Sequence, residues 1–460
     1  MVIRAHFNTT FRPRYWLISA KARSDDEGVC RYSEEERRSL RRKSAVSRRV
    51  AHGFPALLRY SSELCKSTNL LLAPCRTANR AQRDAEAVLK WALGYNQAMW
   101  NVFRNLRQAT FPLYLGVDIG TTSIKAVEVK QGEKLPTILN YGTLELGGYL
   151  LRANNALQTS TLKIFEEDAA ELLKILVGKM KPRAREVIAS LPAFAAFTTV
   201  LDFPAMTPEE LKKTIAFQAK EYIPQPLSEV AIDWLKVGEF QDEKGFRHDQ
   251  ILLISVPREQ IKRYQRLFKL AGLTLRALEI ESLGLARILT SGDPTLTLLV
   301  DIGSRSTSIS FAVKGELRFV SQSDFAGASL TQALAQGLNI NPLRAEELKR
   351  ERGIAHAGQG YELSTIMLPF LDAIINEVKK AQFSYGSQFP GAPQPERIVL
   401  TGGGANLTGI DAYFEREMGM PVVKAAPFTR FEHLPELEPI VPEVGPVLAV
   451  ALGLAMREFI

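Results

Sequence analysis

Cysteine is scarce in this 460-residue chain: its three copies, Cys30, Cys65 and Cys75, all lie near the start. Residues 111–460 contain none, so that part can form neither a disulfide nor a thiolate metal site, and it suits a reducing cytoplasm. Long apolar runs are missing too. The longest candidate, 444–456, falls short of the roughly 18–20 residues that span a bilayer, and arginines interrupt any apolar signal-peptide core after the first residue. Integral membrane and disulfide-rich secreted proteins are therefore excluded.

Positive charge is confined to one end of the sequence. The whole chain has a net charge of +8. Residues 1–110 carry 21 basic against 9 acidic side chains, a net of +12, and residues 111–460 carry the other 37 against 41, a net of −4. We therefore separate a basic, Arg-rich extension, 1–110, from a body, 111–460. Because the body is net negative and lacks a basic–aromatic pattern, we expect no nucleic-acid partner.

The extension shows no sustained period of 2 or 3.6 residues. One interpretation is an arm that binds nucleic acid or a membrane surface. The other, which we favour, is a disordered tail, or upstream sequence translated from a start assigned too early. Met99 lies 19 residues before Asp118, where a compact domain would begin. We therefore expect Met99 to be the true start and residues 99–112 to form a short basic, amphipathic leader.

The body contains one pattern twice. LYLGVDIGTTSIKAVEVKQGEK starts at Leu113, and LTLLVDIGSRSTSISFAVKGEL starts at Leu296, which places Asp301 183 residues after Asp118. Each copy has an apolar strand, an Asp-Ile-Gly turn, a Ser/Thr-rich hairpin and a second strand. Such a repeat predicts two related α/β lobes with a cleft between them.

The chemistry of the repeat fits a phosphate site. Asp118 and Asp301 each end a buried strand, so their carboxylates are expected to project into the cleft and hold Mg²⁺, directly or through water. Glycine two residues later lets the backbone turn tightly and approach a phosphate. Hydroxyl and amide groups of both hairpins can then bind phosphate oxygens. The remaining members of the predicted site in these two hairpins are Gly120, Thr121, Thr122, Ser123, Lys125, Gly303, Ser304 and Thr307.

A third motif follows a predicted strand at 397–400. It contains Gly402, Gly403, Gly404 and Asn406, and a helical stretch at 407–418 comes next. Glycines between a strand and a helix admit a ligand to the helix N-terminus, where the dipole and free N–H groups favour anions. The motif therefore predicts a second set of nucleotide contacts.

A fourth element lies on a helix that Asn341-Pro342 begins. Glu346 and Lys349 are three residues apart on it, so they share a face and could reach a ribose or an adenine. A surface ion pair is the alternative interpretation of these two side chains.

Two Asp-Ile-Gly hairpins and a Thr-Gly-Gly-Gly turn, in this order, resemble the superfamily of actin, the Hsp70 chaperones and sugar kinases. The resemblance implies a two-lobed, duplicated, ribonuclease-H-like α/β fold with an inserted small α+β subdomain. Its phosphate motifs would be 118–123 and 301–307, its adenosine motif 402–406, and its adenine-contacting pair Glu346 and Lys349. The body is more narrowly similar to the PilM family, the actin-like cytoplasmic proteins of type IV pilus assembly. Three stretches carry this match: GVDIGTTSIKAVEV, PEELKKTIAFQAKEYIPQPLSEVAIDW and VLAVALGLAMREF.

The resemblance covers roughly residues 111–460 and implies a division into domains. The expected parts are a first lobe at 111–192 that returns at 273–294, an insertion at 193–272, a second lobe at 295–443, and a terminal segment at 444–460 packed back on the first lobe.

Within the insertion we expect a helix that Thr207 caps, with Pro208 at its first position and Pro224 ending it. A broad apolar face is expected on this helix. It comprises Leu211, Ile215, Phe217, Ala219 and Tyr222. The other elements expected are strands at 198–203, 229–240 and 250–256, a helix at 258–270 and a terminal helix at 447–459.

By resemblance, the chain is an ATP- and Mg²⁺-binding scaffold, at most a slow ATPase, on the cytoplasmic face of the inner membrane. A groove between insertion and first lobe would hold the N-terminal peptide of a PilN-like membrane protein. The pilus assembly ATPases, the platform protein and self-association are further implied partners. Two alternatives stay open. A small-molecule kinase would need an acceptor pocket with a catalytic carboxylate, and an FtsA-like division filament would carry an amphipathic membrane helix after 447–459.

Overall fold

The computed structural model describes residues 3–8, 112–146, 166–354 and 361–459. All of them belong to one of the two units into which the chain divides, Met1–Ala20 together with Gln108–Ile460. Nearly all of the predicted extension, including Met99 and the leader, lies outside the described residues. The exception is β1 (Ile3–Asn8), which pairs antiparallel with β4 and which the sequence did not predict.

The sheet of the first lobe has the order β1-β4-β3-β2-β5-β9. Three strands form an antiparallel meander, and two further strands extend it in parallel. The strands are β2 (Leu113–Ile119), β3 (Ser123–Lys130), β4 (Thr137–Leu146), β5 (Glu186–Leu191) and β9 (Thr274–Ile280).

The sheet of the second lobe repeats this arrangement in the order β12-β11-β10-β13-β14. Again an antiparallel meander of three strands is extended by two parallel ones. Its strands are β10 (Thr297–Ile302), β11 (Thr307–Val313), β12 (Glu316–Ser323), β13 (Arg397–Thr401) and β14 (Val422–Lys424). The duplication predicted from the two Asp-Ile-Gly repeats is confirmed.

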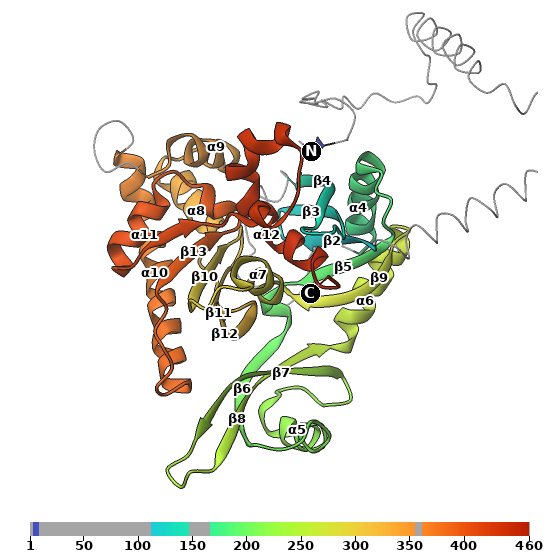
Figure 1. The fold of residues 1–460 in the computed structure, drawn as a ribbon. Helices are drawn as coiled ribbons and strands as arrows, with labels where there is room; N and C mark the ends of the chain where they lie inside the picture. Colours follow the sequence, from blue (N-terminus) through green and yellow to red (C-terminus); the bar gives the residue numbers. More distant parts are fainter. Residues whose placement is uncertain (1–2, 9–111, 147–165, 355–360, 460) are drawn as a thin grey trace, which may run out of the picture. The chain divides into compact units, whose positions relative to one another are not determined.

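Separate sets of helices cover the two sheets (Figure 1). The first lobe carries α4 (Glu166–Met180) and α6 (Arg258–Leu270), which contact each other. The second carries α8 (Gly327–Gly337), α9 (Pro342–Arg352), α10 (Tyr361–Gln388) and α11 (Ile410–Met418). Although α6 lies within the range predicted for the insertion, its buried Tyr264, Leu267 and Phe268 belong to the core that α4 and the first sheet share.

The insertion contains a three-stranded antiparallel sheet in the order β6-β8-β7, packed against one helix. Its elements are β6 (Phe197–Pro204), α5 (Pro208–Tyr222), β7 (Val230–Gln241) and β8 (Arg247–Pro257). The predicted start of α5 is confirmed, because Thr207 caps it in a reciprocal capping box with Glu210. Its predicted apolar face was too broad: Phe217 is 79% and Tyr222 48% exposed, since so narrow a sheet covers only the stripe through Ile215 and Ala219.

Two helices cross between the lobes (Figure 1). The helix α7 (Glu281–Thr290) follows β9 of the first sheet but contacts β10, β11 and β12 of the second. Conversely, α12 (Val441–Ala455) comes after the second sheet but packs on β2, β3 and β5 of the first. Glycine permits this closeness: a Cβ on Gly116 would lie 2.0 Å from the Ala451 carbonyl oxygen, and one on Gly453 would lie 2.1 Å from that of Gly284.

The terminal helix α12 begins earlier than predicted, at residue 441, and holds Pro446 in its interior. Together with the preceding 3₁₀ turn η5 (Pro435–Ile440), it forms an apolar stretch long enough to cross a membrane, counted by length and composition. In this fold 56% of that stretch's apolar window is buried, and most of the helix packs into the core. Its hydropathy is therefore accounted for by contact with the first lobe.

Candidate functional site

The two Asp-Ile-Gly hairpins have the same backbone geometry. The Gly120 N–H donates to the Ser123 carbonyl at 2.9 Å, and the Gly303 N–H donates to the Ser306 carbonyl at 3.1 Å. The glycine loop adjoins the second hairpin. Gly402 has a φ of +80°, and a Cβ there would lie 2.3 Å from Asp301 Oδ1. Only glycine fits this position, both for its backbone and for the space available.

Asp118 is buried and already neutralised by the protein. Lys125 stands directly across from it in the β2–β3 pairing, and its Nζ donates to Asp118 Oδ2 at 2.8 Å. The Ser190 hydroxyl donates to the other carboxylate oxygen at 2.7 Å. Burial alone would lower the pKa of Lys125, but the attraction of Asp118, helped by Asp301 and Glu281, raises it overall. This lysine is therefore held as a cation beside Asp118.

Among the described residues, Asp301 has no such partner. The residue across from it in the β10–β11 pairing is Ser308, whose hydroxyl lies 3.1 Å from that of Ser282. Burial raises the pKa of Asp301 to about 6; Lys125 acts against this rise and the negative charge of Asp118 adds to it. The second hairpin thus presents a carboxylate whose charge the protein compensates only in part.

Glu281 is a third carboxyl at this place, and the sequence analysis missed it. It is the first residue of α7 and accepts a backbone hydrogen bond from Ala193. Burial, together with the charges of Asp118 and Asp301, raises its pKa well above the usual range for a glutamate. The sequence signal that could have identified Glu281 is its position directly after the last strand of the first lobe. Its approach to the two aspartates depends on where the chain crosses between lobes, which spacing does not show.

The donor set fits Mg²⁺ that arrives with a polyphosphate. Asp118, Asp301 and Glu281 together with Lys125 have an excess of negative charge that a divalent cation would reduce. Within the described ranges, no group of three or more His, Cys, Asp or Glu side chains is arranged to hold a metal by itself. Mg²⁺ in nucleotide sites commonly takes one or two carboxylates and fills its remaining positions with water and phosphate oxygens. The metal role of the two aspartates stays a prediction.

The pair on α9 is joined to the second hairpin. Lys349 Nζ donates to Glu346 Oε2 at 2.6 Å, to Thr331 Oγ1 at 2.8 Å and to the Gly327 carbonyl at 3.0 Å. The Gly327 N–H in turn donates to the Gly303 carbonyl at 3.0 Å. Glu346 and Lys349 are only 16% and 12% exposed, so they are not a surface ion pair. Burial would raise the pKa of Glu346, but Lys349 and Thr331 bring it down to about 2.

Two predicted residues direct their polar groups into the protein. The Thr307 hydroxyl donates to the Phe325 carbonyl at 2.7 Å, and the Asn406 amide donates to the Glu443 carbonyl at 2.7 Å. The loop after β13 also differs from expectation. It opens onto the 3₁₀ turn η3 (Gly403–Asn406), and α11 begins only at residue 410, after Gly409 with its φ of +82°. Among the other predicted residues, Thr121, Thr122, Ser123 and Ser304 are partly exposed.

One ion pair joins the lobes beside this site. Arg350 on α9 lies 3.6 Å from Glu145 on β4, and its Nε donates to Glu346 at 2.8 Å. The insertion also reaches the second lobe, because Gln250 donates to the Gln388 carbonyl at 2.9 Å. The site, the insertion and both lobes are therefore in direct contact.

A pocket of about 250 Å³ lies where these parts meet. Its walls come from η2 (Ala193–Ala195) and the start of β6, from Ile280 at the end of β9, and from residues 320–322 of the edge strand β12. Ala193 lines it and donates to Glu281, and Ile280 directly precedes that residue. We call this cavity the junction pocket. Through Ala193 and Ile280 it adjoins Glu281 and therefore the cluster of three carboxyls formed by Asp118, Asp301 and Glu281.

Comparison with known proteins identifies the family. A family model described as type IV pilus assembly protein PilM matches residues 116–459. The chain belongs to the PilM family. A solved structure titled PilM-PilN type IV pilus biogenesis complex superposes with a TM-score of 0.64 at 24% identity, over 75% of this chain and 98% of that one. This similarity confirms the actin-like fold, and family membership confirms that the chain is a type IV pilus assembly protein.

Division proteins are more distant relatives. The cell division protein FtsA of Enterococcus hirae is 24% identical over 337 residues, which covers 65% of this chain and 74% of that protein. The FtsA of Enterococcus faecalis is 22% identical over 333 residues. PilM-family membership, with its longer match, takes precedence over the FtsA-like alternative.

Proposed function

We propose that this PilM-family protein is an ATP-binding scaffold of the pilus assembly platform, in which Mg²⁺–ATP joins the two lobes. The observation that carries the proposal is the contrast between Asp118, which has an ion-pair partner, and Asp301, whose charge is compensated only in part and which lies directly beside a glycine loop that leaves room for a ligand. A triphosphate bound between the hairpins would contact both lobes at once. Nucleotide would therefore favour a closed arrangement.

Most of the predicted residues have a role in this proposal, but Thr307 and Asn406, whose polar groups donate to backbone carbonyls of the protein, have none. Asp301 holds Mg²⁺ and Asp118 orients its water ligands, while the ion neutralises phosphate charge. Backbone amides and hydroxyls of 121–123 and of Ser304 bind phosphate oxygens, while Gly120 and Gly303 form the tight turns of the hairpins. The open space over Gly403 admits the nucleoside, and Glu346 with Lys349 contacts the adenosine.

Hydrolysis in this site would be slow. Burial and the charges of Asp118 and Asp301 raise the pKa of Glu281, so this carboxyl is held towards its protonated form and is less available to accept a proton from an attacking water. Mg²⁺ beside it would favour the ionised form. We propose that the nucleotide acts first as a structural ligand that sets the angle between the lobes.

The partner we propose is the cytoplasmic N-terminal peptide of a PilN-like inner-membrane protein, which would hold the scaffold at the cytoplasmic face. The junction pocket is the groove we assign to it. Two observations support the pocket: the insertion supplies most of its wall, completed by Ile280 of the first lobe and residues 320–322 of the second, and it adjoins Glu281 through Ala193 and Ile280. The match to a PilM-PilN structure supports such a partner. Pilus assembly ATPases, the platform protein and a second copy of this chain are further proposed contacts.

The test is calorimetric titration of the full chain, saturated with Mg²⁺–ATP, with a peptide that copies the N-terminus of the PilN-like protein from the same genome. We expect saturable one-to-one binding. A scrambled peptide of equal charge is the control. If ATP binds and the peptide does not, the proposed PilN-like partner is wrong.

A further inference from the structure

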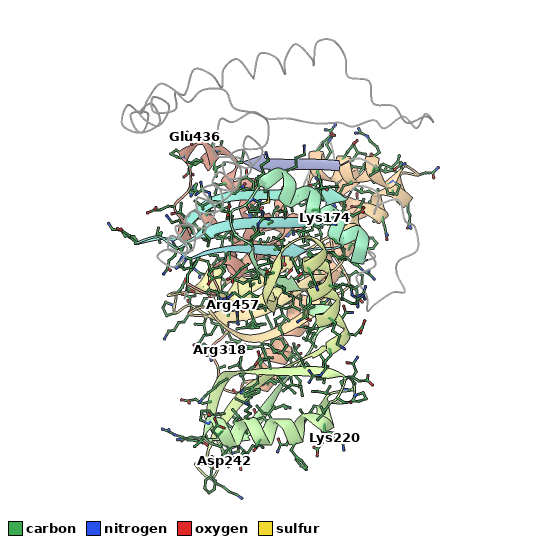
Figure 2. The ribbon with its side chains drawn as sticks, turned by 90° about the vertical axis from the view of Figure 1, so that its right-hand side faces the viewer. Lys174, Lys220, Asp242, Arg318, Glu436 and Arg457 are labelled. Atoms are coloured by element: carbon green, nitrogen blue, oxygen red, sulfur yellow. The ribbon has the colours of Figure 1, made fainter. Side chains whose placement is uncertain are left out.

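One side of the first lobe is strongly basic, although the body as a whole is net negative. Two helices and the loop after α4 form it, and Figure 2 looks onto this side with Lys174 labelled on α4. We call it the basic face. Besides Arg258 and Arg266 of α6, it has seven exposed cations: Lys174, Lys179, Lys181, Arg183, Arg185, Lys262 and Lys269.

These charges have little local compensation. None of the seven forms an ion pair in the part of the chain that the structure describes, whereas Arg276 nearby pairs with Glu186 and Glu458. Among the described side chains of α4 and α6, the exposed acidic ones are Glu171 and Glu259. The seven cations thus stand against three exposed acidic side chains, Glu171, Glu259 and Glu186, an excess of four positive charges among the described side chains, against −4 for residues 111–460 as a whole.

The loop that carries three of these cations is fixed from inside. The buried Glu128 carboxylate accepts the backbone N–H groups of Arg183 at 2.6 Å and Ala184 at 2.8 Å. The buried Asn140 amide donates to the Met180 carbonyl at 2.5 Å. Lys181, between them, has a φ of 51°, a backbone conformation that residues other than glycine adopt infrequently. A loop held in this way presents its side chains outward without further ordering.

Aliphatic side chains lie among the cations. Ile175 on α4 is 44% exposed and Leu270 on α6 is 42% exposed. The aromatic side chains of α6, Tyr264 and Phe268, are buried, so the described part of this face offers no ring on which a base could stack. Lysine and arginine around exposed aliphatic groups suit a lipid headgroup region, where the stems contact hydrocarbon and the charges meet phosphate.

We propose that the basic face docks directly on an anionic phospholipid bilayer. This contact is independent of the proposed nucleotide and peptide sites, because none of its residues belongs to either. It would add to any attachment through a membrane protein and would set which side of the first lobe faces the membrane. A polybasic surface gains affinity with each cation near anionic lipid, and the gain declines with salt.

The test compares two charge-reversed variants of the full chain by co-sedimentation with vesicles. One combines Lys174→Glu, Lys179→Glu, Lys262→Glu and Lys269→Glu. The matched control combines Lys212→Glu, Lys213→Glu, Lys220→Glu and Lys244→Glu, four exposed lysines of the insertion (Figure 2 labels Lys220). Both variants change the net charge equally and keep the Arg-rich residues 1–110, so any binding by that segment cancels. The vesicles are phosphatidylcholine with or without about one third phosphatidylglycerol.

We expect the first variant to lose on the order of 100-fold or more in partitioning onto phosphatidylglycerol vesicles, and the control to stay within about threefold. Replacing Ile175 and Leu270 by serine should give a smaller loss with no change in charge. Hydrogen exchange should slow in 171–180 and 258–270 only with anionic vesicles. Melting curves that match the native protein exclude misfolding of the variants.

Equal losses in the two charge variants, or no loss in either, would overturn the proposal. So would absence of protection in 171–180 and 258–270 on the vesicles. If the first variant instead loses binding to a short DNA duplex while its vesicle partitioning is unchanged, the basic face is a nucleic-acid surface and the membrane assignment is wrong.

Discussion

The two Asp-Ile-Gly hairpins are alike in backbone and unlike in charge. Each pairs its aspartate with one residue of the next strand, and that residue is Lys125 in the first lobe and Ser308 in the second. Asp118 therefore has Lys125 as an internal counterion, whereas the same lysine offsets only part of the negative charge of Asp301. Duplicated geometry therefore does not imply duplicated chemistry: the carboxylate of the first copy is neutralised within the protein, and we propose that a ligand neutralises that of the second.

Removal of the internal counterion of Asp118 should have the strongest consequence. Lys125→Met leaves the buried Asp118 charge unpaired, and the free energy of unfolding should decrease by about 3–5 kcal/mol. Urea denaturation measures it. Ser308→Ala at the equivalent position should cost only about 1 kcal/mol, because it removes a single neutral hydrogen bond. Equal losses at the two positions would contradict the asymmetry.

A smaller effect is expected from removing Asp301, the carboxylate that we propose as the Mg²⁺ ligand. Asp301→Ala should weaken Mg²⁺–ATP binding by about 10- to 150-fold, the equivalent of roughly 1.5–3 kcal/mol for a charged interaction. Calorimetric titration with and without Mg²⁺ separates the metal from the nucleotide. Ser308→Ala again serves as the control and should leave affinity within about twofold. Unchanged affinity in Asp301→Ala would remove this residue from the site.

The pH dependence of stability should show the same asymmetry on a smaller scale. The pKa of Asp301 is raised from 3.8 to about 6, so its folded form favours the proton. Its favourable contribution is complete below about pH 4 and is lost as the pH rises through about 6. Without Mg²⁺, Asp301→Asn should be more stable than the native protein at pH 7.5, by on the order of 2 kcal/mol, and this advantage should vanish towards pH 4. Paired melting curves across this range measure it, and a pH-independent difference would show that Asp301 has an ordinary pKa.

The smallest effect is expected at the ion pair that joins the lobes. Glu145 and Arg350 are 36% and 56% exposed, so Glu145→Ala should change the free energy of unfolding by less than about 1 kcal/mol. The nearby Arg350–Glu346 contact remains in this variant as an internal control. A small-angle scattering profile of the nucleotide-free protein is the more sensitive measurement, and we expect it to shift towards a more open form. A loss of several kcal/mol would mean that this pair, rather than the helices, holds the lobes together.

Local spacing predicted the features that depend on neighbours in the sequence. The hairpins, the Thr207 cap and the Asn341 cap all follow from residue types a few positions apart, and the structure confirms each. Glu281 and Ser190 were missed because their contacts depend on sheet order and on the crossing between lobes. The burial of Glu128 was also missed. Its alternation with apolar neighbours suggests a side chain in solvent, but both faces of β3 are covered.

Because α7 and α12 each pack on the sheet of the other lobe, the two lobes form a single folding unit. Each sheet is covered by the helix that belongs, in chain order, to the other half. A fragment cut near residue 295 would leave β2, β3 and β5 without α12 and would expose the apolar surface that Gly116 brings against it. The two halves should therefore unfold in a single cooperative transition. Because Gly284 and Gly453 bring the backbones of α7 and α12 into contact, a change in the angle between the halves has to shift this contact.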